Sequence, residues 1–126
     1  MKSLTGHLKL GSAGEDFACR KLEEMGYEII SRNERFKAGE IDIVAMESGE
    51  LAFVEVRTRS IGVMSPPEAT VGPRKLRKLV KCGQIYVENT GWEGPWRVDI
   101  AAITVDKKGS MKFELFKDVT VGLVEL

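Results

Sequence analysis

The pattern of apolar and polar positions divides the chain into two helical segments and several strand-like segments. Apolar residues recur at helical spacing from about Ala13 to Met25, and Gly26 follows as a typical C-terminal helix stop. A second helix is predicted from Pro73 to about Glu88, because proline is favoured at the first helical position. Strand-like stretches cover residues 27–31, 41–46, 51–57, 96–105 and 111–116. This order predicts an α/β domain in which helices flank a central mixed sheet.

The length and composition limit the possible architectures. The chain has 126 residues and is 43% hydrophobic, which predicts one domain, residues 1–126, with residues 1–10 flexible. No segment approaches the roughly 18 to 20 apolar residues that cross a bilayer, and the first residues lack a signal-peptide pattern. Two cysteines do not suggest a disulfide framework. We therefore expect a cytoplasmic protein without a membrane partner.

The charges are unevenly distributed although the net charge is zero. Residues 57–81 contain seven Lys or Arg and only one acid, Glu68, whereas residues 1–56 contain seven basic and eleven acidic residues. Such a basic block is a local electrostatic feature that a neutral isoelectric point conceals. It is either a solvated surface or a binding surface for an anionic partner. The segment 59–72 within it contains two glycines and two prolines, which predicts a loop.

A predicted hairpin brings two acidic residues together. Residues 47–50 form a short polar turn, and a turn of two or four residues places Asp42 directly opposite Glu55. Two carboxylates at that spacing repel each other, and a hard divalent cation such as Mg²⁺ would reverse the penalty. A three-residue turn would instead place Asp42 opposite Val56 and break the site. The alternative interpretation is an ordinary exposed strand pair, although the apolar neighbours of Glu55 make an unpaired carboxylate there costly.

These residues resemble the core motif of the PD-(D/E)xK nuclease superfamily, in which an acid on one strand precedes Glu-x-Lys on the next. Here the motif reads Gly39-Glu-Ile-Asp42 and then Glu55-Val-Arg57. The resemblance extends over most of the chain to the bacterial YraN-like family of predicted endonucleases, which is similar to archaeal Holliday-junction resolvases. The segments that carry it are residues 14–33, 39–45, 53–59 and 66–79, with a weaker match at 97–103.

The resemblance implies a restriction-endonuclease-like fold and a metal-dependent endonuclease that hydrolyses phosphodiester bonds in structured or branched DNA. It implies that Asp42, Glu55 and Glu15 are catalytic residues that bind Mg²⁺ or Mn²⁺. From the residues alone, Glu15 is seven positions before Leu22 and so lies near the buried stripe of its helix. It could equally be an acid in the first helical turn, where the helix dipole favours negative charge. The similarity to junction resolvases also raises a homodimer as a possibility.

One residue departs from the motif. The family pattern has Lys two positions after the glutamate, and this chain has Arg57. Arginine supplies positive charge and a fork that matches phosphate, but it is effectively never a base. Arg57 therefore fits a catalytic role in charge stabilisation. If the reaction needs proton transfer, the same substitution predicts the alternative function, a non-catalytic nucleic-acid-binding module of the same fold.

The second predicted helix carries a basic face. Four of its cations cluster on one side of the helix, opposite a stripe of apolar residues. The cations oppose the helix dipole, which prefers acids at this end, and a nucleic acid passing there would explain the placement. The predicted nucleic-acid-binding residues, DNA being the expected partner, are Arg59, Arg74, Lys75, Arg77, Lys78 and Lys81. Elsewhere, Asp99 is interpreted as a partner in a structural salt bridge, and Trp92 and Trp96 as packing at the edge of the core.

Overall fold

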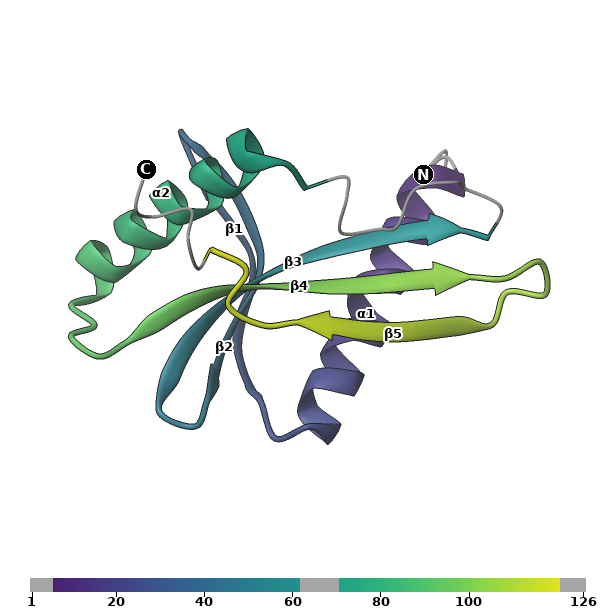
Figure 1. Cartoon of the computed structure of the whole chain (residues 1–126), viewed down its shortest axis with the longest axis horizontal. Coiled ribbons are helices and arrows are strands. Elements are labelled where there is room, and N and C mark those ends of the chain that lie inside the picture. Colours follow the sequence, from purple (N-terminus) through teal and green to yellow (C-terminus); the bar gives the residue numbers. More distant parts are fainter. Residues whose placement is uncertain (1–5, 62–70, 121–126) are drawn as a thin grey trace.

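The computed structural model describes residues 6–61 and 71–120. It confirms the predicted α/β class, since a five-stranded mixed sheet is flanked by two helices, as in the restriction-endonuclease-like fold (Figure 1). In chain order the elements are α1 (Gly6–Glu24), β1 (Glu28–Phe36), β2 (Gly39–Glu47), β3 (Glu50–Ser60), α2 (Pro73–Thr90), β4 (Trp96–Val105) and β5 (Met111–Phe116). No helix within the described ranges is long and apolar enough to cross a membrane.

The sheet follows the order of the chain. Its strands lie in the order β1-β2-β3-β4-β5, and every neighbouring pair is antiparallel except β3 and β4, which are parallel. Parallel neighbours require a crossover connection, and the helix α2 lies in the segment between them. The three strands β1 to β3 therefore form a meander, and β4 and β5 extend it on the other side of the crossover.

The hairpin between β2 and β3 closes with the two-residue turn Ser48-Gly49. Both residues have positive φ, 54° and 79°, as the tight turns that match strand twist require. Met46 pairs with Leu51 and Val44 with Phe53, which confirms the predicted register. The pairing ends at Ile43 and Val54, and beyond it β1 and β2 turn away from β3, β4 and β5 (Figure 1).

Each face of the sheet packs against one helix. Successive residues of a strand point to opposite faces, so Val54 and Phe53 belong to two different clusters. The cluster on the α1 face includes Ala18 and Leu22 of α1, both fully buried. The cluster on the α2 face contains Phe53, Leu79, Cys82 and Val98, with Trp92 and Trp96 packed against it as predicted. The two helices are thus held on opposite faces.

The structure corrects some predicted boundaries. The helix α1 begins at Gly6, so residues 6–10, which we expected to be flexible, are helical. The helix continues through Gly11, because one glycine weakens a helix by about 1 kcal/mol but does not end it. The strand β1 continues to Phe36, five residues past the prediction. The predicted loop 59–72 starts later, because β3 runs to Ser60; its residues 62–70 lie outside the described ranges.

Candidate functional site

Asp42 and Glu55 lie where the strands β2 and β3 separate. They are the next residues on the two strands after the last pair, Ile43 and Val54. At this point a side chain continues the hydrogen bonding, since the backbone N–H of Val56 donates to Oδ2 of Asp42 over 2.8 Å. Glu55 is buried, with 4% of its surface exposed. The predicted direct pairing of Asp42 with Glu55 is not part of the register, because the strands separate one residue earlier, and the two acids instead follow the last pair.

The two carboxylates interact unfavourably. The pKa of Asp42 is raised from its ordinary 3.8 to about 7, first because the group is buried and then because the Glu55 charge is close. The charges of Glu15 and Glu40 raise it further, while the hydrogen bond from Val56 opposes the shift. Three neighbouring acids thus disfavour the charged form of Asp42. Such a site favours a bound cation.

Two cations converge on Glu55. Its Oε2 atom accepts a hydrogen bond from Nη1 of Arg57 at 3.1 Å and lies 3.7 Å from Nζ of Lys75. The sequence predicts that Lys75 contacts nucleic acid, whereas in the structure its ammonium pairs with Glu55. A sequence signal for this existed: Lys75 lies four and seven residues before the buried Leu79 and Cys82, and so falls on the buried stripe of α2.

Glu15 approaches the site from α1. The helix comes very close to β3 here, because Gly14 lies against Thr58 and an added Cβ would meet the threonine hydroxyl. Arg32 of β1 holds Glu15 through an ion pair of 3.2 Å between Nη2 and Oε1. Glu15 is the tenth residue of α1, and the first turn contains no acid, so the alternative based on the helix dipole is wrong. Its charge acts on Asp42, as a third member of an acidic site would.

The basic face of α2 is exposed as predicted. Arg74, Arg77, Lys78 and Lys81 all lie on the solvent side, whereas the buried residues of α2 are Leu79, Cys82 and Gly83. Arg57 and Arg59 are partly buried and follow Glu55 along the same face of β3. Lys75 of α2 and Arg57 of β3 both form ion pairs with Glu55, and so connect the basic helix to the acidic pair.

The donor atoms suit a hard divalent cation. In the part of the chain that the structure describes, no three His, Cys, Asp or Glu side chains are grouped as a complete metal site. Mg²⁺ does not need such a cage, because it is held by one or two carboxylates and keeps water or phosphate oxygens. Asp42 and Glu55 can supply those two carboxylates, and their mutual repulsion is the cost that a cation would remove.

A second polar cluster is structural. Arg97, 7% exposed, bonds to the fully buried Asp99 at 3.0 Å and also to Glu47 and Glu50. The Tyr27 hydroxyl joins it, accepting from Arg97 and donating to Asp99. The predicted salt bridge of Asp99 is confirmed. This network ties β4 to the hairpin and to the end of α1, away from the face that carries Glu55.

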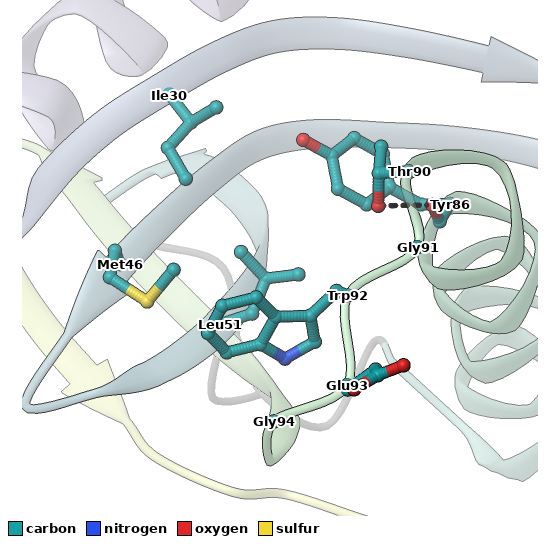
Figure 2. Close-up of a pocket in the computed structure, with 9 residues that line it drawn as sticks. All are labelled: Ile30, Met46, Leu51, Tyr86, Thr90, Gly91, Trp92, Glu93 and Gly94. Carbon is teal, nitrogen blue, oxygen red and sulfur yellow. Dashed lines mark hydrogen bonds between the residues drawn. The ribbon is translucent and has the colours of Figure 1, made fainter.

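A cavity of about 490 Å³ lies at the C-terminal end of α2 (Figure 2). Its lining is largely apolar and includes Ile30, Met46, Leu51, Tyr86 and Trp92. The acidic pair does not contribute to it, since Lys75 meets Glu55 at the opposite end of the helix. The cavity is therefore separate from the candidate site.

Comparison with known proteins places the chain in a family. Residues 14–103 match the model of the uncharacterised protein family UPF0102. Similar proteins named UPF0102 occur in Cytophaga hutchinsonii (39% identical, covering 78% of this chain and 87% of that protein) and in Streptomyces griseus (41%, covering 80% and 87%). Among solved structures, Pyrococcus furiosus SfsA in complex with Ca²⁺ has a TM-score of 0.37 and 12% identity, over 88% of this chain and 63% of that one. The chain therefore belongs to UPF0102, the YraN-like family that its motifs resemble.

Proposed function

We propose that this protein is a metal-dependent endonuclease that hydrolyses phosphodiester bonds in structured or branched DNA. The observation that carries the proposal is the carboxylate pair at the strand separation, formed by the buried Glu55 and the partly buried Asp42, with two cations on Glu55. Asp42, a carboxyl group with a raised pKa close to Glu55 and its two cations, is in the kind of environment found at catalytic sites. The exposed basic face of α2 adjoins it and suits a phosphate backbone.

In this proposal the roles divide by charge. Asp42 and Glu55 hold one or two Mg²⁺ or Mn²⁺ ions, with Glu15 available from α1. A metal held there would supply water activation and charge stabilisation for the hydrolysis of a phosphodiester bond. Arg57 donates a hydrogen bond to Glu55, and this position beside the acid supports a role in neutralising the charge that develops on the phosphate. The exposed cations of α2 bind neighbouring phosphates.

Cleavage assays test the proposal. Purified protein is incubated with four-way junction, flap and duplex DNA in Mg²⁺ or Mn²⁺. Cleavage is expected, and Asp42→Ala or Glu55→Ala should lower its rate at least about 100-fold, the size of effect typical for lost transition-state stabilisation. The control is Glu114→Ala, which removes an exposed carboxylate from the edge strand β5. Wild-type protein without activity on any of the three substrates would refute the nuclease function.

A second function, DNA binding without cleavage, is favoured by one observation. Arg57 occupies the position where the motif has lysine, and arginine does not accept a proton from water. The variant Arg57→Lys separates the two functions. Cleavage by the wild type supports the enzyme, whereas cleavage that appears only in Arg57→Lys would identify a protein that binds DNA and has lost its chemistry.

A further inference from the structure

The ion pair between Lys75 and Glu55 joins the basic helix to the acidic pair. Lys75 belongs to α2, and its ammonium lies 3.7 Å from Oε2 of Glu55 on β3. The neighbouring cations Arg74 and Lys78 point to solvent instead. Lys75 thus belongs to the basic helix and also contacts Glu55, one of the two proposed metal ligands.

The two cations on Glu55 are held unequally. Arg57 lies two residues away on the same strand, and its planar group makes a hydrogen bond of 3.1 Å. Lys75 reaches across from another element, and its longer contact is an ion pair without a hydrogen bond of this length. Its side chain is 43% exposed and ends a flexible four-carbon stem. Of the two contacts, the one to Lys75 is the easier to release.

Charge balance explains why release would follow metal binding. With both acids ionised, the two negative charges of Asp42 and Glu55 are balanced by Arg57 and Lys75, which both pair with Glu55. The charges of Glu15 and Glu40 are balanced separately, by Arg32 and Arg35. A divalent cation at the same carboxylates leaves the group with two excess positive charges. The ammonium of Lys75 would then lie beside the metal and be repelled by it. A DNA backbone, with one negative charge per phosphate, supplies the missing anions.

We propose that Lys75 is a displaceable counter-ion that couples metal binding to DNA binding at the proposed nuclease site. Without metal it neutralises Glu55. When the metal binds, Lys75 leaves Glu55 and binds a phosphate of the DNA that lies along Arg74 and Lys78. Coupling of this kind is reciprocal, so DNA also strengthens the binding of metal. The proposal rests on the proposed metal site, and it does not require that the DNA be cleaved.

Binding measurements on three proteins test it: the wild type, Lys75→Met and, as a matched control, Lys78→Met. Both variants remove one cation from α2, but Lys78 is exposed on the solvent side. Metal affinity is measured by Mn²⁺ titration without DNA. DNA affinity is measured by fluorescence anisotropy of a four-way junction, with and without Ca²⁺, which also takes oxygen ligands. In the wild type we expect Ca²⁺ to tighten DNA binding by about 5-fold or more, the usual size of such coupling.

Lys75→Met should bind Mn²⁺ several-fold more tightly than the wild type and lose most of the Ca²⁺ effect on DNA binding. Lys78→Met should weaken DNA binding equally with and without Ca²⁺, and leave Mn²⁺ affinity nearly unchanged. Identical behaviour of the two variants would overturn the proposal, because Lys75 would then be an ordinary phosphate contact. Unchanged or weaker Mn²⁺ binding by Lys75→Met would also overturn it.

Two further results separate this proposal from the nuclease function. Lys75→Arg keeps the charge and should retain at least part of the coupling between Ca²⁺ and DNA binding. This variant is a control for misfolding of Lys75→Met. If both variants melt at the wild-type temperature and both lose the coupling, the lysine side chain itself is required. A wild type that couples Ca²⁺ to DNA binding without cleaving DNA would contradict the nuclease but support the counter-ion. A wild type that binds neither Mn²⁺ nor Ca²⁺ would refute both.

Discussion

A carboxyl group that is buried beside a second carboxylate makes protein stability depend on pH. Asp42 has an ordinary pKa of 3.8 and, in the folded protein, a pKa of about 7. Between these values the folded state keeps a proton that the unfolded state has released, so the free energy of unfolding falls as pH rises. Above about pH 7 the full cost of two ionised neighbours is present. A shift from 3.8 to about 7 corresponds to roughly 4 kcal/mol.

The variant Asp42→Asn should therefore be more stable than the wild type at pH 8 in the absence of metal. Asparagine keeps an oxygen for the Val56 N–H and removes the charge that Glu55 repels. The stability difference between variant and wild type should be small near pH 4, grow as the pH rises to about 7, and then remain constant. Urea unfolding with EDTA across this range measures it, with Glu114→Gln as the control. A difference that does not change with pH would contradict the assigned repulsion.

At the scale of the elements, the position of α2 depends on one glycine. A Cβ added to Gly83 would lie 2.9 Å from the ring atoms of Phe53 and from Cζ3 of Trp96. Phe53 is almost fully buried and is held by edge-to-face contacts with Tyr86 and Trp96. Because these rings cannot move aside easily, the glycine sets the distance between helix and sheet. That distance in turn allows Lys75, two turns earlier, to reach Glu55.

Gly83→Ala should destabilise the protein by about 1 to 3 kcal/mol, the usual cost of overpacking a core. Helix propensity alone predicts the opposite sign, a gain of about 1 kcal/mol. Gln84→Ala, at the next and exposed position, isolates the propensity effect and should be neutral or slightly stabilising. Thermal or urea unfolding of both variants compares them. A stabilised Gly83→Ala protein would show that α2 can move away from Phe53 without cost.

At the scale of the whole molecule, the zero net charge conceals a separation of charge. The basic helix α2 packs on the face of the sheet that carries Glu55, and its Lys75 pairs with that acid. A phosphate contact releases counter-ions from DNA, so each one adds to the salt dependence of binding. The proposed DNA surface can therefore be located by the salt dependence that its cations produce.

Replacing Arg74, Arg77 and Lys78 together by glutamine should reduce the slope of log K against log salt concentration by about 2 to 3. Each residue removed is expected to contribute slightly less than one unit. The control replaces three exposed lysines at the other end of the molecule, Lys107, Lys108 and Lys112, with the same change in net charge. An equal reduction of the slope in both triple variants would indicate attraction by net charge and not a defined surface.

The sequence by itself determined the elements and one register. Periodicity located both helices and all five strands, since it depends only on which residues must be buried. The sequence left the turn between β2 and β3 at two or four residues, and both lengths give the pairing of Met46 with Leu51 that the structure shows. Asp42 and Glu55 could therefore be brought together before any fold was known. The start of α1 was not predictable in the same way, because helix ends depend on weak local preferences.

The tertiary structure decided how distant elements meet. Lys75 contacts Glu55, whereas Arg74 and Lys78 are exposed to solvent. This difference depends on how closely α2 packs on Phe53. The charge of Glu15 raises the pKa of Asp42. This effect depends on the close approach of α1 to Thr58 and on the ion pair between Glu15 and Arg32. Local patterns determine which face of a helix is buried, but not which side chain of another element that face meets. Contacts between elements are set by packing distances and by charge, and these exist only once the chain has folded.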